Sequence, residues 1–138
     1  MGVVLGLGVM PGCATGPARL PGVEVVAEEG ESALRVKADW ADVEAAVTVA
    51  LGKSELVKVR LERPDPSRLV YTLRTSRDEP ATLTIDRLDG LETADPVRMR
   101  LGCRVGRFGD TPREGMFLSL VAERLEQLRG VEVAPLSE

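Results

Sequence analysis

Apolar and polar residues alternate along five stretches of the chain, and this period of two predicts five short strands. The stretches are residues 33–38, 55–62, 68–75, 81–86 and 97–105. Segments rich in proline, aspartate and glycine separate the last four, so these strands are expected to pair as successive antiparallel hairpins. The residues predicted to face inward are Leu34, Val36, Val57, Val59, Leu61, Leu69, Tyr71, Leu73, Leu83, Ile85, Val97, Met99, Leu101, Cys103 and Val105.

Two other segments have the period of an amphipathic helix. In residues 39–54, Asp39 is placed to cap the first turn and Gly52 to end the last. In residues 109–130, Thr111 and Glu114 have the spacing of a capping box. The predicted apolar stripes are Trp40, Val43, Val47, Ala50 and Leu51 in the first helix, and Met116, Phe117, Leu120, Val121, Leu125 and Leu128 in the second.

These elements predict an α+β fold in the order β-α-β-β-β-β-α. It would form a single domain over residues 32–130, followed by a C-terminal tail at 131–138. The sheet is expected to be mainly antiparallel, with four to five strands. Both helices should pack on one face of it, because the sheet has one apolar side. The other face of this two-layer sandwich would be exposed to solvent or to a partner.

The first twelve residues are apolar and glycine-rich, and we interpret residues 1–12 as a signal segment whose basic start lies a few codons upstream of Met1. Residues 10–13, Met-Pro-Gly-Cys, resemble the lipobox of bacterial lipoproteins, which implies lipid attachment at Cys13. Residues 13–31, which begin at this cysteine, would then form a flexible tether. The alternative is an N-terminal strand or a disordered leader on a cytoplasmic protein.

The second cysteine, Cys103, falls among inward-facing apolar residues and is predicted to be a small buried side chain. A lipid-bearing Cys13 cannot form a disulfide, so Cys103 would stay free. A bridge between Cys13 and Cys103 is the competing arrangement.

The composition of the chain argues against several classes of partner and site. With 18 basic and 22 acidic residues the net charge is -4, so no nucleic-acid partner is expected. The chain has no histidine and two cysteines, and no metal site or cofactor is predicted. The serines therefore lack a histidine partner, neither GxSxG nor SxxK occurs, and no catalytic residue is predicted.

Paired carboxylates are the remaining route to catalysis, because two carboxyl groups cut glycosidic bonds in many hydrolases. Each acid of this kind stands where aspartate commonly caps a helix or a turn, and we interpret them all as structural. They are Asp39 with Asp42, Asp86 with Asp89, and Asp95.

A basic stripe follows the polar face of the last strand, in Arg98, Arg100 and Arg104, with Arg107 just beyond it. Lys58 and Arg60 would join the stripe if the sheet places them on the same face. Such a face could bind an acidic envelope protein or a polysaccharide. The alternative is a solvated face whose charge is balanced by residues such as Glu62 and Asp86.

Residues 105–110, Val-Gly-Arg-Phe-Gly-Asp, resemble the V-G-x-F-G-D motif that precedes the C-terminal helix in a family of small bacterial envelope lipoproteins of unknown function. The resemblance covers about residues 33–128 and implies export and lipid anchoring. Locally, Gly106 and Gly109 would permit the bend, Phe108 would plug the edge of the core, and Asp110 or Thr111 would cap the helix. The alternative is an anion-binding loop over residues 106–111.

The function expected from these patterns is non-catalytic. The protein would be an interaction or assembly module, anchored to a membrane by lipid on Cys13 and facing the periplasm or the exterior of a bacterial cell. The alternative is a soluble cytoplasmic enzyme or regulator that begins at Met1. A small-molecule pocket between helix and sheet is a third option, and dense packing of Trp40 and Phe117 argues against it.

Overall fold

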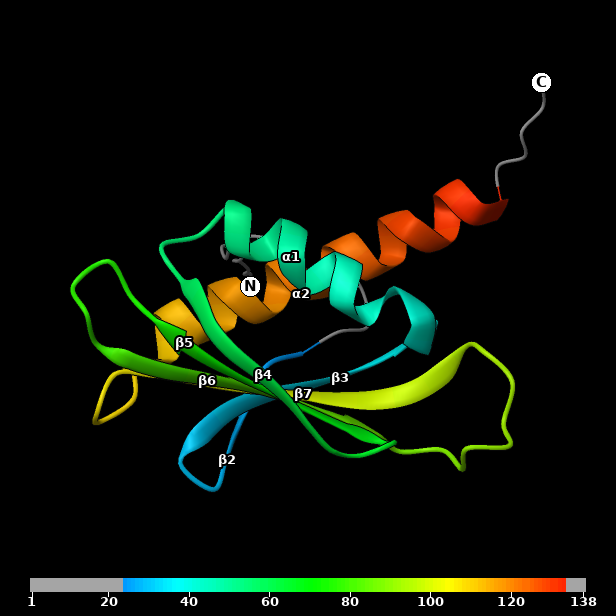
Figure 1. Ribbon diagram of the computed structural model, residues 1–138, viewed down its shortest axis with the longest axis horizontal. Coiled ribbons are helices and arrows are strands. Elements are labelled where there is room, and N and C mark those ends of the chain that lie inside the picture. Colours follow the sequence, from blue (N-terminus) through cyan, green and yellow to red (C-terminus); the bar gives the residue numbers. More distant parts are fainter. Residues whose placement is uncertain (1–23, 134–138) are drawn as a thin grey trace, which may run out of the picture.

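The computed structural model describes residues 24–133, and within them one antiparallel sheet carries two helices on a single face (Figure 1). This confirms the predicted α+β class. The elements in chain order are β2 (Val26–Glu28), β3 (Glu31–Ala38), the short 3-10 helix η2 (Trp40–Asp42), α1 (Val43–Gly52), β4 (Val57–Asp65), β5 (Arg68–Arg74), β6 (Pro80–Arg87), β7 (Val97–Val105) and α2 (Thr111–Val133).

The sheet has six strands rather than the four to five predicted, in the order β2-β3-β7-β6-β5-β4, and every neighbouring pair is antiparallel. The additional strand is β2, which lies within the predicted tether at 13–31. A tight turn at Glu29 and Gly30, which have φ angles of 50° and 82°, folds β2 back onto β3. The predicted tether was therefore wrong over its last residues.

The C-terminal boundary of the domain also differs from the predicted one. Helix α2 continues to Val133, three residues beyond the predicted domain end at 130 and into the predicted tail at 131–138. The predicted signal segment 1–12, Cys13 and the first part of the tether lie outside the described residues.

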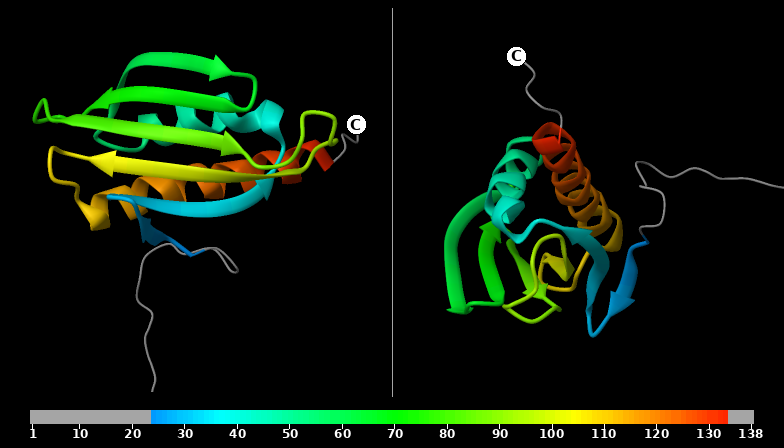
Figure 2. Two further views of the ribbon diagram at one scale, coloured as in Figure 1. Left: turned by 90° about the horizontal axis from the view of Figure 1, so that it is seen from below. Right: turned by 90° about the vertical axis from the view of Figure 1, so that its right-hand side faces the viewer.

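The core lies between the sheet and the two helices, which sit side by side where the sheet curves around them (Figure 2). Strands β5, β6 and β7 turn alternate residues toward the helices, as the pattern predicted. Cys103 is fully buried and free, which confirms its predicted role as a small core residue. From the helices the buried apolar residues are Val43, Ala46, Val47 and Ala50 of α1, and Phe117, Leu118, Val121, Ala122 and Leu125 of α2.

Three residues predicted to face inward are exposed instead. Val57 and Val59 on β4 are 61% and 57% exposed, because β4 is an edge strand whose pairing is shifted by a bulge between Lys58 and Arg60. Met116 on α2 is 61% exposed, because the buried side of this helix is centred on Phe117, Leu118 and Val121. The physical cause is the same in each case: the neighbours packed against an element select its buried side.

The cap of α1 differs from the predicted one, and at α2 the structure selects Asp110 from the two predicted caps, Asp110 and Thr111. Asp39 makes no side-chain cap: its carboxylate accepts a hydrogen bond from Arg129, and η2 precedes α1. At α2, Asp110 caps the helix by accepting a hydrogen bond of 3.3 Å from the Arg113 backbone N–H. Glu114 reaches back to the backbone N–H of Asp110, at 2.8 Å, so the capping box is shifted by one residue from the predicted Thr111–Glu114 pair.

Candidate functional site

The basic stripe predicted on β7 lies on the outer face of the sheet, which the described helices do not cover. Arg98, Arg100 and Arg104 alternate with the buried residues of β7. Arg60 on β4 pairs with Thr72 and shares this outer face. Lys58 does not, since it pairs with Leu73, whose side chain faces the helices. The bulge that follows Lys58 therefore puts it on the opposite face from Arg60, and its predicted place in the stripe was wrong.

Arg100 is the most deeply set arginine of this face. Its guanidinium bonds Glu28 at 2.9 Å and Glu31 at 2.7 Å, and its side chain is 15% exposed. Hydrogen bonds from Arg35 and Arg100 hold the pKa of the Glu28 carboxyl below its usual range. Gly102 makes room for this cluster, because a Cβ atom there would lie 2.6 Å from a Glu31 oxygen and 2.7 Å from a nitrogen of Arg100.

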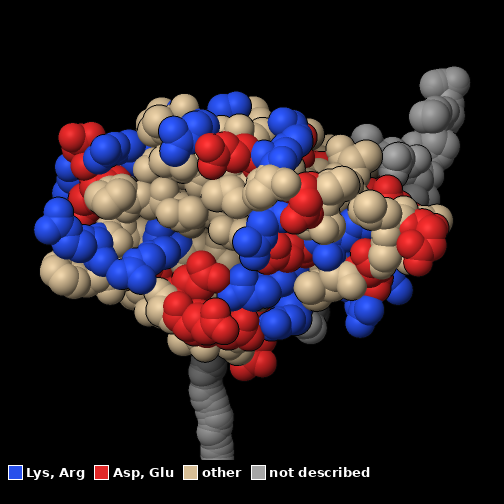
Figure 3. All heavy atoms as spheres, turned by 60° about the horizontal axis from the view of Figure 1, so that its bottom comes forward, with Lys and Arg blue, Asp and Glu red and all other residues tan. Residues whose placement is uncertain are grey.

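Other arginines of the outer face are also held by hydrogen bonds or ion pairs. Arg98 binds the carboxylate of Asp89 through its backbone and side chain, and these hydrogen bonds lower the pKa of Asp89. Arg104 donates to the backbone oxygens of Gly30 and Arg107. Further ion pairs join Arg60 to Glu62 at 3.5 Å and Arg68 to Asp86 at 2.6 Å. Figure 3 accordingly shows acidic and basic side chains interspersed, which supports the charge-balanced alternative.

The loop at residues 106–111 bends as predicted, with φ angles of 80° at Gly106 and 82° at Gly109. Phe108, however, is 91% exposed and does not plug the core, because the two left-handed glycines turn the loop away from the sheet. Side chains of the protein already bind the free N–H groups at the start of α2. The Glu114 carboxylate accepts a hydrogen bond from the Asp110 N–H, and the Asp110 carboxylate accepts one from the Arg113 N–H. This argues against the anion-binding alternative.

Glu114 is a buried acid that was predicted only as a member of a capping box with Thr111. Its carboxylate accepts hydrogen bonds from the Ser32 hydroxyl, the Val105 N–H and the Asp110 N–H, at 2.7, 2.9 and 2.8 Å. The sequence signal was its position, one turn before Phe117 and Leu118 on the core side of the helix. Three donors satisfy this carboxylate, so its role is to join α2, β3 and β7.

The paired carboxylates considered for catalysis are mostly engaged in structural contacts. Arg129, Arg68 and Arg98 bind Asp39, Asp86 and Asp89, and Asp95 accepts the Trp40 backbone N–H at 2.8 Å. Asp42 differs, because its pKa is raised. Burial is the largest cause, and the nearby negative charges of Asp39 and Asp95 add to it. No group of three potential metal-binding side chains occurs among residues 24–133.

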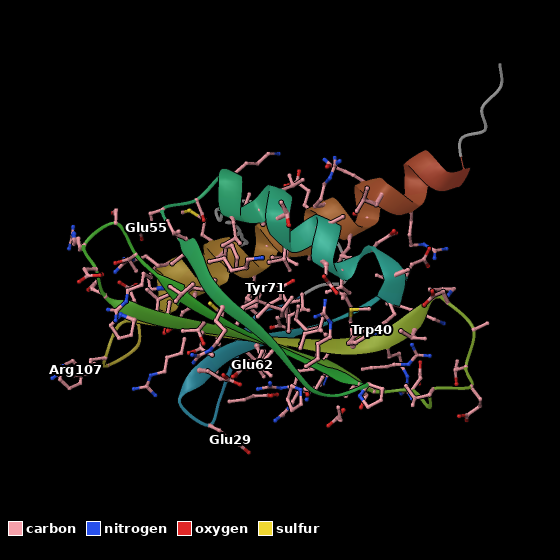
Figure 4. The ribbon with its side chains drawn as sticks, in the orientation of Figure 1. Glu29, Trp40, Glu55, Glu62, Tyr71 and Arg107 are labelled. Atoms are coloured by element: carbon pink, nitrogen blue, oxygen red, sulfur yellow. The ribbon has the colours of Figure 1, made fainter. Side chains whose placement is uncertain are left out.

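Within residues 24–133, one depression opens on the surface at Glu55 and another at Trp40, and these two residues, at opposite ends of the fold, are labelled in Figure 4. The first, of about 330 Å³, lies beside the end of α1 and the first turns of α2. It opens to solvent between the α1–β4 connection and α2, and Val105 is the one sheet residue in its lining. Its lining is Lys53, Ser54, Glu55, Leu56, Val105, Arg113, Met116, Phe117 and Leu120.

A network of ion pairs forms the polar wall of the first depression. The Arg113 guanidinium binds Glu55 at 2.7 Å, Glu79 at 3.0 Å and Asp110 at 3.3 Å. Its hydrogen bonds lower the pKa of both Glu55 and Glu79 and raise that of Arg113. Because three carboxylates already share this guanidinium, Arg113 is a structural clamp and not a free anion receptor.

The second depression, of about 600 Å³, is hereafter the Trp40 depression. Residues from η2 and α1 line one side of it, and residues around the β4–β5 turn line the other. They are Trp40, Ala41, Glu44, Arg63, Asp65, Pro66 and Leu69. Trp40 was predicted as a core residue, and it is packed against the core while also lining this opening.

No protein-family model and no curated protein matches this sequence. The resemblance of residues 105–110 to envelope lipoproteins stays a prediction. Within residues 24–133, no helix is both long and apolar enough to cross a bilayer.

Proposed function

We propose that the protein is a non-catalytic binding module of the bacterial cell envelope, anchored in a membrane by lipid on Cys13. In this proposal the outer face of the sheet docks a partner protein in the periplasm or at the cell exterior. The lipobox-like residues 10–13 would supply the signal for export and lipid attachment. Several acyl chains on one cysteine would hold the protein on the membrane far more firmly than one chain does.

The observation that carries the docking role is the outer face of the sheet, which no described helix covers. Five of the six strands have seven to nine residues, and at a spacing of about 4.8 Å they present roughly 630 Å², which approaches the roughly 800 Å² per partner of a standard interface. An uncharged strip lies between the arginines of β7 and the charged residues of β4, with Thr72 opposite Thr82 and Val70 opposite Thr84. Uncharged contact area flanked by ion pairs is common in protein interfaces.

Charge balance on this face favours a protein over a polyanion. Glutamates and aspartates already hold Arg98 and Arg100, so a polyanionic partner would have to displace them. A protein surface with charges of both signs can instead extend the existing ion pairs. This is the reason for committing to a protein rather than a charged polysaccharide.

Lipid anchoring is tested by the mass of the intact protein extracted from membranes of a bacterial host that expresses the gene with its upstream DNA. We expect a chain that begins at Cys13 and carries a diacylglyceryl group and a further acyl group. The Cys13→Ala variant should be unmodified, and the matched Cys103→Ala variant should be modified like the wild type. An unmodified wild-type chain in the soluble fraction would overturn the anchor and favour the cytoplasmic alternative.

Docking is tested separately by photo-crosslinking in cells. A photoreactive amino acid at Thr82, exposed on the outer face, should give a defined adduct with a protein. The same amino acid at Glu126, exposed on α2, is the matched control and should give none. Equal adducts from both positions, or none from Thr82, would refute docking through the sheet while leaving the anchor standing.

A further inference from the structure

We propose that the Trp40 depression binds a neutral saccharide. The proposal goes beyond the docking role of the sheet and does not depend on the lipid anchor. Its volume of about 600 Å³ lies within the range of about 300–1,000 Å³ that small-molecule sites occupy.

Two contacts position Trp40, one at its backbone and one at its ring. Its backbone N–H donates to Asp95 at 2.8 Å, and the Arg87 guanidinium lies over the ring, 5.9 Å from the centroid. Arg87 is itself fixed by the backbone oxygens of Gly90, Leu91 and Thr93. A ring positioned in this way can accept a ligand without first losing its own freedom of movement, which favours binding.

The remaining lining combines apolar and hydrogen-bonding groups. Pro66 and Leu69 extend the apolar surface of the indole. Glu44 and Arg63 form an ion pair between α1 and the β4–β5 hairpin, and both side chains are half exposed. One oxygen of Asp65 accepts two hydrogen bonds from Ser67 at 2.8 Å, which leaves its second oxygen as an acceptor.

These groups match the chemistry of a sugar ring. A pyranose presents C–H groups on its faces, which pack against an aromatic side chain, and hydroxyl groups around its rim, which both donate and accept hydrogen bonds. Carboxylates and a guanidinium are suited to hold those hydroxyls. The Trp40 depression offers the flat apolar surface and both kinds of hydrogen-bonding group within one opening.

Charge selects among ligand classes. The lining carries two carboxylates, Glu44 and Asp65, and one guanidinium group, that of Arg63, while Arg87 lies outside the lining over the Trp40 ring. A phosphate or nucleotide would meet the carboxylates and would have to separate Arg63 from Glu44. A neutral polyhydroxyl ligand avoids this cost, and we therefore commit to a neutral saccharide.

The test uses the fluorescence of Trp40, because it is the chain's one tryptophan. The full chain is titrated with chitotetraose, cellotetraose and maltotetraose, and with ATP as an anionic comparison. We expect a saturable change of tryptophan emission with at least one of the saccharides, with a Kd of about 1 mM or tighter. The absence of a saturable response to all three, or tighter binding of ATP, would overturn the proposal.

Variants then locate the site. Arg63→Gln and Asp65→Asn should each weaken the best saccharide about fivefold or more, because each removes a hydrogen-bonding group that faces the ligand. Both positions are on the exposed hairpin, so the fold should survive. The matched control Arg124→Gln, on α2 and outside the lining, should leave affinity unchanged. Unchanged affinity in both hairpin variants, measured by calorimetry, would place binding elsewhere and overturn the assignment.

Discussion

The hydroxyl of Ser32 on β3 donates a hydrogen bond of 2.7 Å to the carboxylate of Glu114 on α2. Both residues are buried, and 82 positions separate them in the sequence. The same carboxylate accepts the backbone N–H groups of Val105 and Asp110. One acidic side chain therefore connects the start of the C-terminal helix to two neighbouring strands.

Replacing Glu114 should destabilise the fold in proportion to the hydrogen bonds that are lost. Glu114→Ala leaves two buried donors and the part-buried Asp110 N–H without an acceptor, and we expect it to lower the free energy of unfolding by about 3 kcal/mol or more. Glu114→Gln keeps an acceptor oxygen and should cost about 1 kcal/mol. Urea denaturation measures both values, with the exposed Glu126→Gln as control. Equal stability of the alanine variant and the wild type would contradict the role assigned to Glu114.

The buried side of α2 is tested by one charge placed at two positions. Val121→Asp puts a carboxylate into the core and should unfold the domain. Met116→Asp, at a side chain that is 61% exposed, should change the free energy of unfolding by no more than about 0.5 kcal/mol. Circular dichroism during thermal unfolding distinguishes the two variants. If Met116→Asp unfolded the protein as Val121→Asp does, the assigned orientation of the helix would be wrong.

The chain's two phenylalanines should respond in opposite ways to truncation. Phe117 is 2% exposed in the core, and Phe117→Ala should cost about 3–5 kcal/mol. Phe108 is 91% exposed, and Phe108→Ala should cost no more than about 0.5 kcal/mol. Chemical denaturation of the two variants measures the difference. A large loss at Phe108 would restore the prediction that it plugs the core.

Stability should fall in acid through the ion pairs of Arg113. Its hydrogen bonds lower the folded-state pKa of Glu55 and Glu79 below the ordinary value of 4.5. The stabilisation is therefore complete above pH 4.5 and is lost as the pH falls through the lowered values. The free energy of unfolding, measured between pH 7 and pH 3, should fall less steeply in Arg113→Gln than in the wild type. The control Arg124→Gln should follow the wild type, and an unchanged slope in Arg113→Gln would contradict this account.

Much of the fold follows from periods within single segments. Alternation in β5, β6 and β7 correctly placed residues such as Tyr71, Ile85 and Cys103 in the core, because a strand turns successive side chains to opposite faces whatever it pairs with. The helical period likewise found Val47 and Val121. These central elements are packed on their apolar side by the rest of the fold, so the local pattern and the tertiary environment agree.

The tertiary structure decided the features that depend on residues far apart in the chain. Strand β2 has three residues and becomes a strand by pairing with β3, and the bulge in β4 puts Lys58 and Arg60 on opposite faces. Trp40 and Arg63 line one depression from separate elements, which no single-segment period encodes. The sequence alone determined the class of fold and its central core. Pairing, ion pairs and depressions required the folded chain, because each arises from the contact between segments and not from the order of residues within one.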